Sequence, residues 1–254
     1  MTLPRTPSFR LDGRRALVAG ASSGIGAAAA VALAEQGAEV TLCARREAEL
    51  QALAKEMRAE GWTVDVLPLD ITDVAAVEAA LTEQPAFDVL VNSAGFARHS
   101  PALETRPEDF DLVSSLNFRA AYFLTRTVAR RLVQAGRPGS LINISSQMAH
   151  VGGIDRAVYA ATKHAVEGMT KSMAIEWGPH GIRVNTIAPT FIRTALTAQT
   201  FANPERAAWI ASKIKLNRVG EVTDIMGAVA FLASDAAALV TGTSLVVDGG
   251  WTAD

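Results

Sequence analysis

The chain has 254 residues, of which 49% are apolar, and a formal net charge of −2 from 24 basic and 26 acidic side chains. The charges are mixed along the sequence without a basic face or stripe, so we expect neither a nucleic-acid nor a membrane partner. The single cysteine, Cys43, excludes an internal disulfide, and no group of Cys and His residues has the spacing of a metal site.

Residues 1–10 form a short extension before the first apolar run. The opening residues MTLPRTPS contain no apolar stretch typical of a signal peptide, and no segment reaches the roughly 20 apolar residues that span a bilayer. We therefore expect a cytoplasmic protein with one domain over residues 11–254.

Short apolar runs alternate with segments of helical periodicity from residue 15 onward. Several runs are rich in Val, Ile and Leu without polar alternation, which is typical of strands buried on both faces. The expected strands are 16–19, 39–43, 63–68, 87–91, 140–145, 182–188 and 244–247. The expected helices are 25–36, 47–60, 73–83, 107–135, 158–177 and 223–234. This alternation predicts an α/β fold: a doubly wound (Rossmann) seven-stranded parallel sheet with helices on both faces.

Residues 194–220 separate the last two expected strands by more than a simple crossover requires. The segment carries apolar residues, among them Phe201 and Trp209, between polar ones. Two interpretations stay open: a substrate lid at the binding edge of the sheet, or a surface helix pair that packs on a neighbouring subunit.

A glycine-rich turn follows the first expected strand and precedes an Ala-rich helix. One glycine permits the tight turn, the next lets the backbone approach a pyrophosphate, and the third lets the helix pack on the strand. A diphosphate would then lie at the helix N-terminus, where free N–H groups and the helix dipole favour an anion. The residues expected to bind a dinucleotide here are Gly20, Ser22, Ser23, Gly24, Ile25 and Gly26.

Arg45 and Arg46 end the second expected strand, and no acidic residue follows until Glu47. An acid near this point holds the ribose 2′-hydroxyl of NAD, whereas Arg accommodates the 2′-phosphate of NADP. We therefore predict that NADP(H) is preferred over NAD(H). The alternative is that both arginines simply begin a solvated helix.

Tyr159 and Lys163 lie four residues apart in an expected helix, and spacing of this kind places them on one face. A phenol with a pKa of about 10 is a poor base at neutral pH, and a nearby ammonium favours its anion. Ser146, at the end of the fifth expected strand, could polarise a carbonyl oxygen. Each residue alone is more often structural, so the prediction of a proton-handling site depends on their combination with the glycine turn.

Together these motifs resemble the short-chain dehydrogenase/reductase family, in its compact single-domain form, over residues 11–251. The matching segments are Gly20-x-x-x-Gly24-x-Gly26, Leu69-Asp70-Ile71, Asn92-Ser93-Ala94-Gly95, Asn117, Ile144-Ser145-Ser146, Tyr159-x-x-x-Lys163, and Val184-Asn185 with Ala188-Pro189. One departure is Thr190, where the family usually has glycine; its hydroxyl either shapes substrate preference or belongs to a simple turn residue.

The resemblance implies a role for each matching residue. Tyr159 would exchange the proton, Ser146 would orient the carbonyl, and Lys163 would bind the nicotinamide ribose and lower the pKa of Tyr159. Asn117 would hold a water that extends the proton relay. The further residues implied in cofactor binding are Asp70 and Ile71 at the adenine, Asn92, Ala94 and Gly95 along the nucleotide, and Pro189, Ile192 and Thr194 at the nicotinamide.

The substrate is less defined than the reaction. The resemblance implies a small-molecule substrate, namely a sugar acid, a polyol or a 3-oxoacyl thioester. Arg98 and His150 are candidates for contacting a carboxylate or a polyhydroxylated substrate, although such loop residues are more often only solvated. The other pocket candidates are Phe96, His99, Gln147, Met148 and Trp209.

Two classes of function stay open at this point. The first is an active ketone reductase or secondary-alcohol dehydrogenase, which the four intact catalytic positions favour. The second is a nucleotide-binding regulator or scaffold without turnover. The resemblance also implies a homotetramer or homodimer, and apolar residues of the long helices would supply the interface: Phe118, Tyr122, Met169, Met173 and Ile175.

Overall fold

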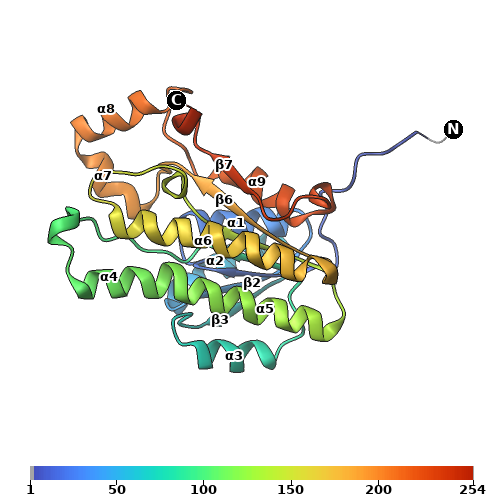
Figure 1. Ribbon diagram of the computed structural model, residues 1–254. Coiled ribbons are helices and arrows are strands. Elements are labelled where there is room, and N and C mark those ends of the chain that lie inside the picture. The colour runs from blue at the N-terminus through green and yellow to red at the C-terminus, as the bar shows by residue number, and fades with distance from the viewer. Residues whose placement is uncertain (1–2, 254) are drawn as a thin grey trace.

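A parallel sheet of seven strands in the order β3-β2-β1-β4-β5-β6-β7 forms the centre of the computed structural model, which describes residues 3–253 (Figure 1). The strands are β1 (Arg15–Ala19), β2 (Glu39–Ala44), β3 (Val64–Pro68), β4 (Val89–Asn92), β5 (Gly139–Ile144), β6 (Ile182–Pro189) and β7 (Ser244–Val247). Every pair of neighbours is parallel. The predicted doubly wound α/β fold is confirmed.

Helices cover both faces of the sheet (Figure 1). One face packs on α1 (Gly24–Glu35), α2 (Glu47–Ala59) and α9 (Thr223–Ala233), and the other on α3 (Val74–Thr82), α5 (Ala121–Ala135) and α6 (Ala157–Trp177). Each layer encloses its own cluster of buried apolar side chains. These layers leave the carboxyl edge of the sheet free for loops, which is where such folds bind ligands.

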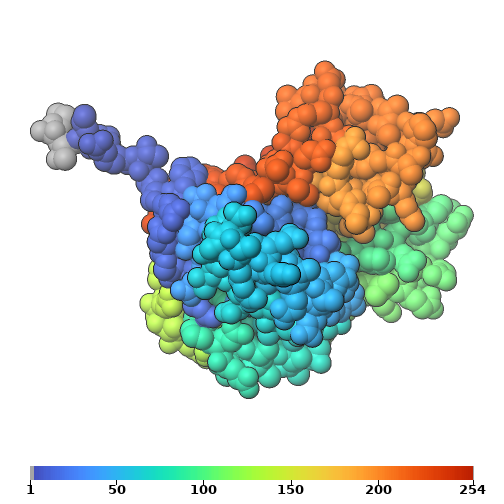
Figure 2. Space-filling view, turned by 180° about the vertical axis from the view of Figure 1, so that it is seen from behind, coloured from blue at the N-terminus to red at the C-terminus, as the bar shows by residue number. Residues whose placement is uncertain are grey.

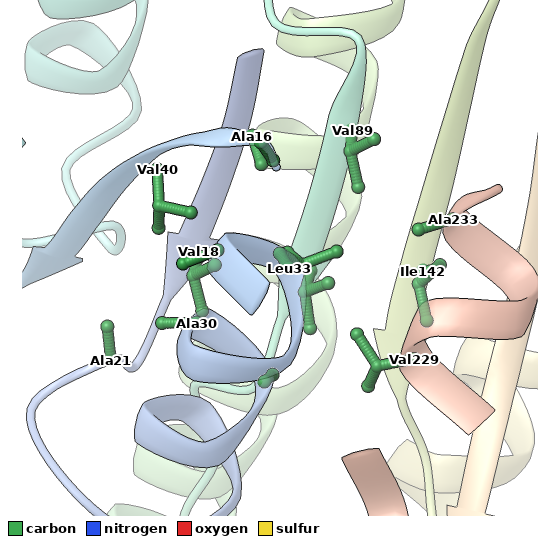
Figure 3. Close-up of a cluster of buried hydrophobic side chains, with 14 of the residues drawn as sticks. Ala16, Val18, Ala21, Ala30, Leu33, Val40, Val89, Ile142, Val229 and Ala233 are labelled. Atoms are coloured by element: carbon green, nitrogen blue, oxygen red, sulfur yellow. The ribbon is translucent and has the colours of Figure 1, made fainter. Parts of the chain in front are cut away.

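The first layer shows why the Ala-rich segment forms a helix that lies close to the sheet. Alanine has the highest helix propensity and a small side chain, so α1 can approach β1 closely. Figure 3 shows Ala30 and Leu33 of α1 beside Val18 of β1, with Val229 of α9 farther along the same layer. Full burial of an aliphatic side chain such as Leu33, which has no exposed surface, contributes roughly 1.5–3 kcal/mol.

The expected continuous helix over residues 107–135 is wrong in one respect. The structure has α4 (Pro107–Ser114), then a π-helical turn, η2 (Ser115–Ala120), then α5. Within this turn the Asn117 side chain hydrogen-bonds both backbone groups of Phe96, at 2.8 Å each. Single π turns inside α-helices are frequent at functional sites, and Asn117 is one of the expected catalytic residues.

The segment between β6 and β7 folds into short helices: η5 (Ala195–Thr197), α7 (Ala198–Ala202) and α8 (Pro204–Lys213). Figure 2 shows this orange segment projecting from the body on the side where the green segment after β4 also lies. Aromatic contacts hold it: Phe201 lies against Phe191 and Trp209 against Trp251, with ring centroids 6.4 and 5.4 Å apart. We call residues 194–220 the lid segment.

The remaining short helical turns lie in connections: η1 (Ala102–Glu104), η3 (Gln147–Ala149), η4 (Gly178–His180), η6 (Asp235–Ala237) and η7 (Trp251–Ala253). Cys43 is fully buried, and burial raises the pKa of its thiol to about 12. It is therefore a small core residue, as expected. Over residues 3–253, no helix is long and apolar enough to cross a membrane.

Candidate active site

The residues singled out in the sequence gather at the carboxyl edge of the sheet. Gly20 follows β1, Arg45 follows β2, Ser146 follows β5, and Asn92 and Pro189 end β4 and β6. Parallel strands bring all these ends to one edge. The doubly wound topology therefore assembles positions that are far apart in the sequence into one site.

The glycine turn packs closely against neighbouring parts of the backbone. Gly20 and Gly24 have φ values of +78° and +58°, a backbone region that residues with a side chain rarely adopt. A Cβ on Gly20 would lie 2.7 Å from Ala94 N, and one on Gly26 would lie 2.2 Å from Gly20 O. Only glycine fits at these two positions, because the chain's own backbone lies against them. This turn, the glycine cradle, lies at the N-terminus of α1, where a dinucleotide pyrophosphate is expected.

A cluster of donors lies beside this turn at the end of β2. Arg46 Nη2 donates to Ser22 Oγ at 2.8 Å and to Ser23 Oγ at 3.1 Å. Arg46 also pairs with Glu49, at 3.2 Å, whereas Arg45 lies 3.9 Å from Asp70. The guanidinium of Arg46 thus lies over the two serines of the turn, while Arg46 itself precedes α2 with a side chain that is 54% exposed.

The residues expected at the adenine and along the nucleotide lie in the next loops. Burial would raise the pKa of Asp70, but hydrogen bonds from Thr72 and the charge of Arg45 outweigh it and lower the pKa. Ile71, beside Asp70, is buried. Asn92 joins β4 to β5 through a 3.1 Å bond to Asn143, and Ala94 N donates to Asn92 Oδ1 at 3.3 Å.

The expected nicotinamide-binding residues connect β6 to the lid segment. Ile192 is buried and pairs with Gly220 in a short parallel bridge, which ties the two ends of the lid segment together. Thr194 begins η5, where its N–H donates to Thr197 Oγ1 at 3.0 Å. A Cβ on Gly24 would lie 3.2 Å from Thr194 Cγ2, so the start of the lid segment lies directly against the glycine turn.

Tyr159, Lys163 and Ser146 come together as the spacing predicted. Lys163 is buried, donates to Ile144 O at 2.8 Å, and has its Nζ 5.7 Å from the centre of the Tyr159 ring. Ser146 Oγ accepts from Met148 N at 3.1 Å, which fixes the hydroxyl at the start of η3. The ammonium, the phenol and the hydroxyl therefore face one small volume at the end of β5.

Burial dominates the ionisation of this group of side chains. It raises the pKa of Tyr159, while the Ser146 hydroxyl and the charge of Arg156 act in the opposite direction. It lowers the pKa of Lys163 to about 8, against the opposing charge of Glu167 one turn further along α6. Tyr159 is consequently a protonated acid at neutral pH, beside an ammonium that would stabilise its anion.

Asn117 lies next to these residues, although its side chain is engaged by protein groups. Its Oδ1 accepts from Phe96 N, and its Nδ2 donates to Phe96 O and, at 3.3 Å, to Thr162 Oγ1. A Cβ on Gly95 would lie 3.5 Å from Asn117 Oδ1 and 3.7 Å from Lys163 Nζ. Gly95 therefore lies directly beside both polar groups, where a water of the expected relay would have to bind.

The pocket candidates separate into two groups. Arg98 pairs with Asp109 at 3.7 Å, and His150 Nε2 lies 2.9 Å from Ser244 Oγ, so both are engaged away from Tyr159. His99 instead packs edge-on against the Tyr159 ring, with centroids 6.3 Å apart. Of the basic candidates, the structure thus brings only His99 into contact with Tyr159.

Sequence reasoning missed Arg156 and Thr162. Arg156 Nη1 contacts His99 Nε2 at 3.0 Å, and Thr162 Oγ1 donates to Tyr159 O at 2.7 Å while its oxygen accepts from Asn117. Thr162 could have been found by its position beside Lys163 on the helix. Nothing in the local sequence indicated the contact of Arg156 with a residue 57 positions away.

Comparison with known proteins identifies the family. A family model described as enoyl-(acyl carrier protein) reductase matches residues 20–252. The D-erythrulose reductase of Gallus gallus is 40% identical over 245 residues, which cover 96% of this chain and 98% of the relative. The chain belongs to the short-chain dehydrogenase/reductase family. It is an oxidoreductase of that family that interconverts carbonyl groups and secondary alcohols.

Two further relatives of the family share the whole domain. The gluconate 5-dehydrogenase of Gluconobacter oxydans is 38% identical over 248 residues, covering 96% of both chains. The crystal structure of a gluconate 5-dehydrogenase from Burkholderia cenocepacia in complex with NADP and tartrate superposes with a TM-score of 0.94 at 37% identity, covering 97% of this chain and 98% of that one. The similarity therefore extends over the sheet, both helical layers and the lid segment.

Proposed function

We propose that the protein is an NADP(H)-dependent oxidoreductase of sugars, polyols or sugar acids, with Tyr159 as its proton donor and acceptor. The observation that supports this best is the buried ammonium of Lys163 beside the phenol of Tyr159, at the sheet edge that carries the glycine cradle. The relatives reported above act on a ketose and on a sugar acid, which favours the carbohydrate substrates over a 3-oxoacyl thioester.

In this proposal the nicotinamide nucleotide supplies or accepts the hydride when bound, and the protein handles the proton. Ser146 donates a hydrogen bond to the carbonyl oxygen and orients it. Tyr159 then gives its proton to that oxygen as negative charge develops there. Lys163 stabilises the resulting phenolate, and a water beside Gly95 and Asn117 returns a proton.

The proposed preference for NADP(H) depends on Arg46. Its guanidinium is held over the hydroxyls of Ser22 and Ser23, so three donors converge beside the site where the adenosine ribose is expected. A planar guanidinium can bind a phosphate through two parallel hydrogen bonds. The two residues that directly follow β2 are arginines, and the carboxylates nearby, Asp70 and Glu49, face these arginines.

Replacement of Tyr159 by Phe tests the catalytic proposal. Tyr159→Phe should reduce NADPH oxidation with a ketose by at least 100-fold while NADPH still binds, because only the proton donor is removed. Tyr122→Phe is a matched control, since Tyr122 is the other tyrosine of the chain and is 39% exposed. Substantial turnover by Tyr159→Phe would contradict the role given to this residue.

We also propose that the chain forms a homotetramer, or at least a homodimer. Phe118, Tyr122 and Ile175 on the long helices are exposed by 37%, 39% and 79%, and Val246 of the edge strand β7 by 38%. Met169 and Met173, expected at the interface, are instead buried in the core of the chain itself. A cytoplasmic location stays a prediction.

A further inference from the structure

The guanidinium of Arg156 is separated from Tyr159, the proposed proton donor, by the ring of His99. Arg156, just before α6, donates from Nη1 to His99 Nε2 at 3.0 Å, and the His99 ring lies edge-on to the ring of Tyr159. The same guanidinium lies over the ring of Phe191, 5.3 Å from its centre. Two aromatic partners from different loops, His99 and Phe191, therefore hold Arg156 near Tyr159.

The loop before α6 adopts an unusual conformation that directs Arg156 toward this position. Asp155, the preceding residue, has a φ of +60°, which non-glycine residues adopt rarely. A Cβ on Gly153 would lie 3.2 Å from Arg156 Cδ and 2.9 Å from Met148 Sδ. The stem of Arg156 thus passes over a glycine, in a space that any larger residue would fill.

The neighbouring Asp155 acts on the charge of Arg156 at longer range, without forming an ion pair with it. Among residues 3–253, no carboxylate forms an ion pair with Arg156 or with Arg206 on α8 of the lid segment. Burial and then the charge of Arg206 lower the pKa of Arg156, whereas Tyr159 and Asp155 act in the opposite direction. Arg156 is partly buried, whereas Arg206 is exposed. A partly buried cation is normally paired, so a guanidinium without an ion pair, beside a second positive charge, favours an anion.

His99 does not supply that anion and leaves most of the guanidinium available. Partial burial and the charges of Arg156 and Arg206 lower the pKa of His99 to about 4, so the imidazole is neutral at pH 7. Since Arg can only donate, His99 Nε2 accepts and the ring proton is on Nδ1. Of the five N–H donors of Arg156, His99 engages one.

We infer that the substrate carries a terminal anionic group, a carboxylate or a phosphate, and that Arg156 binds it while Arg206 of the lid segment adds a second positive charge. This inference rests on the proposed function and deepens it. Phe191 and His99 hold the guanidinium of Arg156 near Tyr159. The reacting carbonyl of the substrate and its anionic end are therefore recognised by different side chains.

Arg156 has a second effect that the test must separate from binding. Its charge also acts on Tyr159 directly, in the direction that lowers the pKa of the phenol. An arginine that only tuned Tyr159 would affect every carbonyl substrate equally and would shift the pH profile of the reaction. An arginine that binds an anionic group affects acidic substrates selectively.

The test is a comparison of NADPH-dependent reduction of 5-keto-D-gluconate and L-sorbose, which differ only in a carboxylate against a hydroxymethyl group. A charge-assisted bond to arginine predicts that the native protein prefers the keto acid by roughly 10- to 100-fold in kcat/KM. Arg156→Gln should remove most of this preference through KM of the keto acid, with L-sorbose changed less than about threefold. Arg156→Lys should restore part of it.

Binding without turnover provides a second readout. Calorimetry on the protein with NADP+ should detect L-tartrate but not its neutral counterpart L-threitol, and Arg156→Gln should weaken tartrate binding by at least tenfold. Arg206→Gln should weaken it less, because Arg206 is exposed. Arg14→Gln is the control, since Arg14 pairs with Asp235 at 3.2 Å, outside the site. D-fructose 6-phosphate, compared with D-fructose, distinguishes a phosphate from a carboxylate.

The outcomes separate this inference from the proposed function. Equal kcat/KM for the keto acid and L-sorbose, with no selective loss in Arg156→Gln, would overturn the anionic substrate while leaving a carbonyl reductase. A parallel loss on both substrates with a shifted pH profile would also overturn it, in favour of tuning of Tyr159. Failure of the native protein to oxidise NADPH with any of these carbonyl compounds would contradict the proposed function itself.

Discussion

Replacement of Arg46 by Ala should change which nicotinamide nucleotide the protein binds. Arg46 is held over Ser22 and Ser23 by hydrogen bonds of 2.8 and 3.1 Å, so its guanidinium is already oriented before a ligand arrives. NADPH and NADH differ only in the 2′-phosphate. The loss of Arg46 should therefore weaken NADPH alone.

The size of the effect follows from the contacts of the side chain. A hydrogen bond to a charged group contributes about 1.5–3 kcal/mol, which corresponds to roughly 12- to 160-fold in a dissociation constant. The Arg46 side chain is 54% exposed and already pairs with Glu49, so solvent screening places the expected change toward the lower limit, about 10- to 30-fold. Because the two serines orient the guanidinium, the expected change in Kd is larger than that for the loss of an unconstrained surface arginine.

Fluorescence titration of both nucleotides measures this directly. In Arg46→Ala, the Kd for NADPH should rise by about 10- to 30-fold and that for NADH should stay within about threefold. Arg45→Ala is the matched comparison, because Arg45 is 73% exposed and lies 3.9 Å from Asp70, and its effect should be smaller. An unchanged ratio of the two Kd values in Arg46→Ala would refute the assignment of Arg46 to the 2′-phosphate.

Two further predictions concern pH and assembly. Because burial lowers the pKa of Lys163 to about 8, the ammonium is lost above that pH, and kcat/KM for carbonyl reduction should fall as the pH rises from 8 to 10; a rise over this interval would contradict the role of Lys163. Glu167→Gln removes a charge that raises this pKa, so the fall should begin at lower pH. Light scattering at micromolar concentration should give a mass of four or two chains of 26.8 kDa, and a single chain would exclude the proposed interface.

The fold could be predicted from local sequence because each strand and helix has its own pattern. Buried parallel strands appear in the sequence as continuous apolar runs. A turn that needs a positive φ, such as the one at Gly20, appears as a glycine. The main error, a continuous helix over 107–135, arose because a π turn keeps helical periodicity on both sides. The π turn carries Asn117, which bonds to the backbone of Phe96, a tertiary contact without a local signature in the sequence.

From the sequence, we could predict only those site residues that lie at the ends of strands or at helical spacing from one another. Tyr159 and Lys163 are four residues apart on one helix, so their proximity follows from helix geometry. The contact between Arg156 and His99 instead depends on the left-handed backbone of Asp155 and on the packing of two loops. For the same reason Arg98 and His150 looked equally suitable in the sequence, although Asp109 and Ser244 engage them.

The π turn at η2 also sets how far α5 is rotated about the helix axis relative to α4, because no loop separates the two helices. Each residue of an α-helix rotates the chain by about 100°, so the one extra residue of a π turn rotates everything after it by about that angle. Across this turn, α4 packs on α6, and α5 packs on α3, α6 and the sheet. Loss of one residue here would turn Leu124 and Val128 away from the core, so the length of this segment is as constrained as the identity of Asn117.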